Sequence, residues 1–165
     1  MGPRSLILGV FESHGERMMD VYKWGLVPFW AKDPSAIKST FNARAETVVT
    51  KPMFRKAFAD QDILVPVDAF CEGKTLPPKV KQPYAFTRAD GEPVMFAGLR
   101  EWWKDAEGRE LRTAIIITTE TGPDMPIHNR QSVVLVPNSW DQWLNWEAHD
   151  VEAREKLLVR WSTTR

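Results

Sequence analysis

The chain has 165 residues, of which 43% are hydrophobic and 27% charged, as is usual for one soluble globular domain with a core of its own. Its 22 basic and 22 acidic residues cancel, which counts against a generally basic nucleic-acid binder but leaves room for a local basic patch. A single cysteine, Cys71, excludes an internal disulfide and a cysteine-rich zinc site. No apolar stretch has the length of a membrane span or a signal peptide. We therefore expect a cytoplasmic protein, associated with the nucleoid, that contacts no membrane and carries no metal or other cofactor.

Strand-like alternation or apolar runs recur along the chain. The expected strands are Ser5–Phe11, Met19–Trp24, Asp62–Val67, Pro83–Thr87, Pro93–Leu99, Arg112–Thr118 and Ser132–Val136. Ala89–Glu92 contains an Asp-Gly pair that tolerates positive φ, and it predicts a hairpin between two of these strands. Asp105–Gly108 predicts a second hairpin between the next two.

Helical signals are fewer. Pro52 fits the first turn of a helix that runs to about Ala59. Asn138 or Ser139 can cap a second helix, whose Trp140 and Trp143 are expected to face the core, and a third helix is expected at Val151–Val159. Gly73–Gln82 is rich in Lys and Pro and resembles a linker. These elements predict an α+β fold, mostly antiparallel β with two or three short helices, in one domain spanning residues 1–165.

Polar residues stand where their surroundings favour apolar ones or a plain turn. Asn42 and Arg44 flank an alanine, Glu72 ends a long apolar run, and His128 and Arg130 lie between two expected strands. Such residues at strand ends and in loops are typical of an acid/base and anion-binding site, if folding brings them together.

Each residue also has a structural interpretation. His128 titrates near neutral pH and suits proton transfer, but it can also hydrogen-bond a neighbouring strand. Glu72 is a usable acid or base if burial raises its pKa, and otherwise a solvated carboxylate. Asn42 can orient a substrate or form an Asx-turn. The guanidinium groups of Arg44 and Arg130 can bind phosphates, or they can pair with a carboxylate of Glu46 or Asp68.

Five segments together resemble the SOS-response-associated peptidase family, in the family's order and over roughly Ser5 to Leu158. They are Trp24–Lys32, Asn42–Thr47, Pro52–Arg55, Val65–Glu72 and Met125–Arg130. The resemblance implies a β pseudo-barrel with a positively charged groove for single-stranded DNA, and covalent cross-linking to abasic sites. It places Asn42, Glu72 and His128 on the family's active-site residues. The DNA contacts that we expect are Phe29, Trp30, Arg44, Thr118 and Arg130. The two aromatic rings can stack on unpaired bases or, alternatively, cover the core.

Family members begin Met-Cys-Gly-Arg and use the freed N-terminal cysteine as the nucleophile that attacks the open-chain aldehyde of an abasic site. This chain begins Met1-Gly2-Pro3-Arg4, and both of its ends look truncated. Cys71 is internal and lacks the adjacent amine that a thiazolidine ring requires. We expect the printed chain to lack the nucleophile for cross-linking and for removal of Met1. We also expect it to be a monomer. Three hypotheses follow: an abasic-site cross-linking protein in its complete form, a non-covalent single-stranded DNA-binding module, and an inactive truncated copy.

Overall fold

Six of the seven expected strands are present in the computed structural model, which describes residues 5–37, 40–77, 80–122, 129–145, 148 and 150–161, without the side chains of 72–76, 80 and 81. The expected strand Ser132–Val136 is wrong: the strand there is Arg130–Ser132, and Val134 makes only an isolated bridge to Phe96. The strands are β1 (Leu6–Ser13), β2 (Glu16–Trp24), β3 (Asn42–Arg44), β4 (Asp62–Val67), β5 (Phe70–Leu76), β6 (Val80–Phe86), β7 (Val94–Lys104), β8 (Glu110–Glu120) and β9 (Arg130–Ser132). The α-helices are α1 (Ala45–Val48), α2 (Arg55–Asp60), α3 (Trp140–Leu144) and α4 (Val151–Glu155), and 3₁₀ turns lie at Pro34–Ala36 and Pro137–Ser139.

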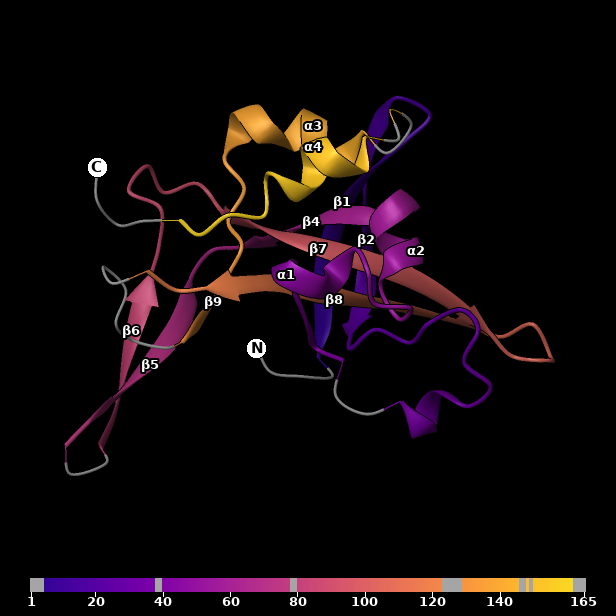
Figure 1. Ribbon diagram of the computed structural model, residues 1–165, viewed down its shortest axis with the longest axis horizontal. Coiled ribbons are helices and arrows are strands. Elements are labelled where there is room, and N and C mark those ends of the chain that lie inside the picture. The colour runs from indigo at the N-terminus through magenta and orange to yellow at the C-terminus, as the bar shows by residue number, and fades with distance from the viewer. Residues whose placement is uncertain are drawn as a thin grey trace.

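One sheet curls on itself and closes. Its strand order is β2-β1-β4-β7-β8-β3, and β2 pairs again with β8, so that β1, β2, β4, β7 and β8 make a five-stranded barrel. Most pairings are antiparallel, whereas β2 and β3 both run parallel to β8. The predicted α+β fold, a mostly antiparallel pseudo-barrel with short helices, is therefore confirmed (Figure 1).

The interior of the barrel is apolar because residues two apart on a strand point to the same face and the residues that point inward are mostly apolar. The run Ile63-Leu64-Val65 on β4 is buried on both faces, with Ile63 and Val65 packed inside the barrel and Leu64 packed outside it. Phe96 of β7 and Ile116 of β8 complete the inner cluster with neighbours from β1 and β2. This rigid frame fixes where the ends of β8 lie.

A second core lies between the outer face of the barrel and the helices, which gather on that face (Figure 1). Trp143 of α3 is fully buried, and its indole Nε1 donates to the Ile63 carbonyl at 2.9 Å. Arg154 of α4 forms a buried ion pair with Asp62 at the start of β4. These two contacts tie the C-terminal helices to the middle of the sheet.

The Gly73–Gln82 stretch is not a linker, because most of it forms the ribbon of β5 and β6, which projects from the barrel (Figure 1). Aromatic packing at the base fixes this ribbon: the Phe70 ring stacks on Phe86 at 5.2 Å between centroids and meets Phe96 edge-on at 5.1 Å. The stretch rich in Lys and Pro therefore belongs to a projecting two-stranded arm, and the composition does not reveal the cross-strand pairing that forms it.

The two predicted hairpin turns have different outcomes. Asp105–Gly108 does join the antiparallel neighbours β7 and β8, with Gly108 at φ 81°. Ala89–Glu92 does turn, with the Gly91 amide donating to the Arg88 carbonyl at 3.2 Å. However, it connects β6 to β7, which belong to different sheets, so the expected hairpin there is wrong.

The three predicted helical regions are present but shorter than expected, as α2, α3 and α4. Ser139 stands at the cap of α3, but its side chain makes no capping hydrogen bond. No helix in the described ranges is long and apolar enough to cross a membrane.

Candidate functional site

The Asn42-Ala43-Arg44 segment forms β3 because β8 offers it an unpaired edge. It runs parallel to β8, with Asn42 beside Ile116 and Arg44 beside Thr118. Ala43 is 1% exposed in the outer core, whereas Asn42 and Arg44 are exposed. The alternation turns both polar side chains to one face of the sheet.

Strand β9 brings Arg130 to the other edge of β8. Ser132 of β9 is opposite Thr118, and Arg130 is opposite Glu120, two residues further along. Side chains of paired residues, and of residues two apart, share a face. The register therefore collects four of the predicted site residues on one face of β3, β8 and β9: Asn42, Arg44, Thr118 and Arg130.

Thr118 and Arg130 are joined by hydrogen bonds. The Arg130 Nε donates to the Thr118 hydroxyl at 3.2 Å, and Nη2 donates to the Thr118 carbonyl at 2.7 Å. The same hydroxyl donates to the Ala43 carbonyl at 3.4 Å, which links Arg130 to β3. Arg130 also pairs with Glu46 of α1, Nη2 to Oε2 at 2.8 Å. Of the two carboxylates that the sequence offered, Arg130 thus takes Glu46 and not Asp68.

The Glu46 carboxylate is held in its ionised form. Partial burial acts to raise its pKa, but hydrogen bonds from Arg130 and from the backbone amides of Glu46 and Glu120 outweigh it and lower the pKa below its ordinary value. The Thr119 hydroxyl donates to the second oxygen at 3.4 Å. Glu46 was expected only as a pairing partner and not as a site residue; its place directly before Thr47, the last residue of the Asn42–Thr47 motif, was the available signal.

The predicted aromatic residues lie on a separate loop. Phe29 and Trp30 are 49% and 51% exposed, so they do not simply cover the core. The loop is anchored by the Trp103 indole, whose Nε1 donates to the Ala31 carbonyl at 2.6 Å, and the Lys56 ammonium lies 5.4 Å from the Phe29 ring centroid. The loop therefore presents two large rings to solvent from a fixed base.

Buried Glu101 lies beneath this loop at 6% exposure. Burial raises the pKa of its carboxyl, while the Trp102 and Phe29 amides and the Lys56 charge act to lower it. The carboxylate accepts the Trp102 amide at 3.1 Å. No sequence signal singled out Glu101, because a glutamate in a strand is ordinarily exposed.

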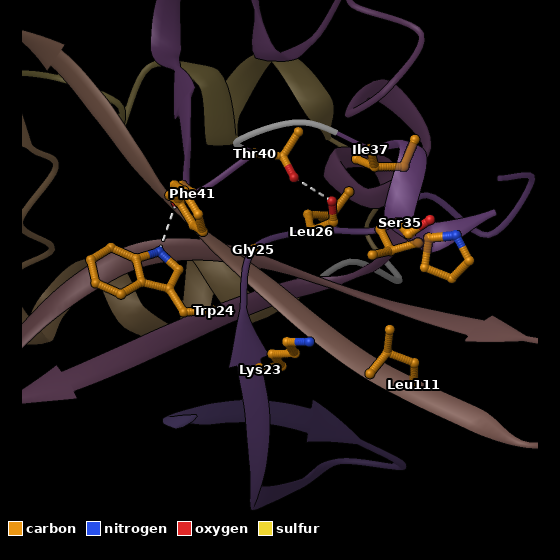
Figure 2. Close-up of a pocket in the computed structure, with 11 residues that line it drawn as sticks. Lys23, Trp24, Gly25, Leu26, Ser35, Ile37, Thr40, Phe41 and Leu111 are labelled. Atoms are coloured by element: carbon orange, nitrogen blue, oxygen red, sulfur yellow. Dashed lines mark hydrogen bonds between the residues drawn. The ribbon is translucent and has the colours of Figure 1, made fainter. Parts of the chain in front are cut away.

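A hollow of about 440 Å³ lies between the end of β2 and the loop that leads into β3 (Figure 2). Trp24 and Phe41 form its aromatic wall, and Lys23 and Leu111 lie along its β2 and β8 side. The Trp24 indole donates to the Phe41 carbonyl at 2.7 Å, which fixes the residue directly before Asn42. The hollow thus adjoins the polar face through the backbone of Phe41.

Two predicted catalytic residues are not placed by their side chains. Glu72 lies in β5 opposite Tyr84, but its side chain is outside the described part, and His128 falls in the stretch 123–128 that is also outside it. Their convergence with Asn42 stays a prediction. Cys71 is exposed on β5 with a free thiol. Within the described ranges, no three His, Cys, Asp or Glu side chains gather closely enough to hold a metal ion.

The chain forms a closed β barrel that carries a polar face of amide, hydroxyl and guanidinium groups at one end of β8. The model of the SOS response associated peptidase (SRAP) family matches residues 1–165. The chain belongs to the SRAP family.

Its relatives include proteins named for abasic-site processing. The abasic site processing protein YoqW of Bacillus subtilis (strain 168) is 36% identical over 159 residues, which are 96% of this chain and 71% of YoqW. The abasic site processing protein YedK of Escherichia coli (strain K12) is 30% identical over 156 residues, which are 94% of this chain and 68% of YedK.

Solved structures share the fold. A crystal structure of a protein from Bordetella bronchiseptica matches with a TM-score of 0.85 and 27% identity, over 100% of this chain and 83% of that protein. A protein from Bacteroides thetaiotaomicron matches with a TM-score of 0.83 and 28% identity, over 94% of this chain and 69% of that one.

Proposed function

We propose that this SRAP domain binds single-stranded DNA at abasic sites. The observation that carries the proposal is the register of β3, β8 and β9, which sets Arg44 and Arg130 on the face that also holds Asn42 and Thr118. Two guanidinium groups on one face suit the successive phosphates of a nucleic-acid strand. The relatives' names, abasic site processing proteins, support an abasic site as the feature that is bound.

The preference for a single strand rests on the exposed rings of Phe29 and Trp30, since stacking on them needs unpaired bases. Their loop is anchored at Trp103, which is opposite Leu111, whereas Arg130 contacts Thr118. Seven residues of β8 separate these points, about 23 Å along an extended strand. Leu111 and Thr118 are an odd number of residues apart and so point to opposite faces of β8. A bound strand that reaches both points must therefore pass from one face to the other and span several nucleotides, in keeping with the roughly four or more that single-strand binding sites occupy.

Non-covalent binding is what we propose for the chain as printed. Capture of the abasic aldehyde as a thiazolidine, with release of water, needs an amine and a thiol on the same N-terminal cysteine. The one cysteine of the printed sequence is Cys71, inside β5. In a form that carries the N-terminal cysteine, we propose that Asn42 orients the reacting groups, that His128 moves protons and that Glu72 supports the removal of Met1.

The binding experiment measures fluorescence anisotropy of labelled oligonucleotides at several salt concentrations. Single-stranded DNA should bind more tightly than duplex, and a strand with an abasic site more tightly than an intact one. Arg44→Ala should weaken binding and reduce the slope of log K against log salt by about 0.7, the value for one single-strand phosphate contact. The control is Arg109→Ala, at the exposed β7–β8 turn, which should leave both quantities unchanged. Equal affinity for duplex and single strand, or a salt slope near zero, refutes the proposal.

The covalent step is tested on a denaturing gel with labelled abasic oligonucleotide. The printed chain should give no heat-stable shifted band, whereas a form with the family's N-terminal cysteine segment should give one. In that form His128→Ala should slow the reaction, and Cys71→Ala should not change it. A stable band from the printed chain that disappears on Cys71→Ala would identify Cys71 as the nucleophile and overturn this part of the proposal.

A further inference from the structure

The Glu46 carboxylate is a fixed group beside the polar face of β3, β8 and β9. Its two oxygens accept hydrogen bonds from Arg130 Nη2 at 2.8 Å and from the Thr119 hydroxyl at 3.4 Å. Its place in the first turn of α1 joins it to a helix whose Ala45 and Val48 are buried in the outer core. The carboxylate therefore has little freedom to follow a moving partner.

Arg130 is held along one edge of its guanidinium group. Nε donates to the Thr118 hydroxyl, and Nη2 donates to both the Thr118 carbonyl and Glu46. Among the described residues, Nη1 has no protein acceptor. The Arg130 side chain is 19% exposed, and its Nε and Nη2 already have acceptors, so Nη1 is the nitrogen left for a ligand.

We infer that Glu46 is a positioning residue for DNA: it fixes Arg130 so that the Nη1 N–H groups meet a backbone phosphate. The inference rests on the proposed function and adds a residue that contacts Arg130 and not the phosphate. A guanidinium group fixed before binding loses less side-chain entropy when it meets the phosphate. Glu46 bonds to Nη2, so a phosphate at Nη1 does not have to displace it.

The sign of one effect separates this role from general electrostatics. Removing a negative charge near a DNA site ordinarily strengthens binding, because repulsion of the phosphates falls. If Glu46 positions Arg130, its removal should instead weaken binding. Glu120 offers a matched comparison: it is directly opposite Arg130 on β8 and exposed, but Arg130 pairs with Glu46.

The test compares Glu46→Ala with Glu120→Ala, each alone and in an Arg130→Ala background. The readout is the Kd for an abasic single-stranded oligonucleotide, measured by anisotropy over a salt series. Glu46→Ala should raise Kd about threefold to tenfold and lower the salt slope toward that of Arg130→Ala. Glu120→Ala should leave Kd equal or lower. In the Arg130→Ala background, Glu46→Ala should cause no further weakening, because paired residues are not additive.

Glu46→Asp is a second variant with unchanged net charge. It withdraws the carboxylate by one methylene group, and should raise Kd although the charge of the protein is the same. Circular dichroism melting shows whether each variant is folded at the assay temperature. If the unchanged protein binds and Glu46→Ala tightens binding as Glu120→Ala does, the inference is overturned while the proposed function stands. The inference is also overturned if Glu46→Ala raises Kd by the same factor in the Arg130→Ala background as it does alone. Failure of the unchanged protein to bind overturns both.

Discussion

The ion pair between Arg154 and Asp62 should contribute strongly to the packing of α4 against the barrel and so to the free energy of unfolding. Both side chains are 1% exposed, and Arg154 also donates through Nη2 to the Ala59 carbonyl at 3.1 Å. Arg154→Ala would leave the Asp62 charge buried without its partner. Breaking a buried pair in this way costs about 3–5 kcal/mol, which is a large part of the roughly 5–15 kcal/mol by which proteins of this kind are stable.

The perturbation can be measured by urea unfolding followed through tryptophan fluorescence, since Trp143 is fully buried. For a domain of this size, a loss of about 3–5 kcal/mol corresponds to a fall in Tm of about 6–20 °C. The surface control is Lys156→Ala, next to the same helix, whose exposed pair with Glu152 should contribute less than about 1 kcal/mol.

A double variant separates the ion pair from the space that it fills. Within the described part of the chain, Asp62 Oδ1 and Arg154 Nε have no hydrogen-bond partner, so the pair is imperfectly satisfied. Asp62→Leu with Arg154→Met should therefore recover most of the stability that Arg154→Ala loses. A loss below about 1 kcal/mol for Arg154→Ala, or a double variant as unstable as the single one, would refute the reasoning.

Three further results are expected. Gly98→Ala should destabilise by about 1–3 kcal/mol in urea unfolding, because a Cβ there would lie 2.7 Å from the Ile115 carbonyl oxygen; an unchanged midpoint would contradict this. The stability of Glu101→Gln relative to the unchanged protein should increase as pH rises from acid to neutral. Because the pKa of Glu101 is raised in the folded state, its ionisation lowers the free energy of unfolding of the unchanged protein above the unfolded-state pKa, whereas glutamine does not titrate. Urea unfolding of both proteins at the two pH values measures the difference, and a difference that does not change with pH would rule this out. Trp30→Ala should weaken single-strand binding by about 1–3 kcal/mol with little effect on Tm. Met19→Ala, at another exposed apolar side chain, should change neither quantity, and an unchanged affinity of Trp30→Ala would remove stacking from the proposal.

The residues of the polar face could be named from the sequence, but their arrangement could not. Asn42, Arg44 and Arg130 stood out because polar side chains interrupt apolar patterns. That they share a face depends on the register of three strands that are far apart in the sequence. The choice of Glu46 over Asp68 as the partner of Arg130 likewise depends on where α1 begins, which follows from the pairing of β3 with β8.

Element length decided which parts of the fold the sequence determined. Asp62–Val67 forms β4 with the predicted bounds, because a continuous apolar run buried on both faces has few alternatives. Strand β3 has three residues and α1 has four, which is too short for the sequence to show the hydrophobic repeat of a strand or a helix. They exist because β8 supplies a free edge and the outer core takes up Ala43 and Val48. Local pattern therefore determined the barrel strands, and tertiary contact alone decided the short elements that carry the site.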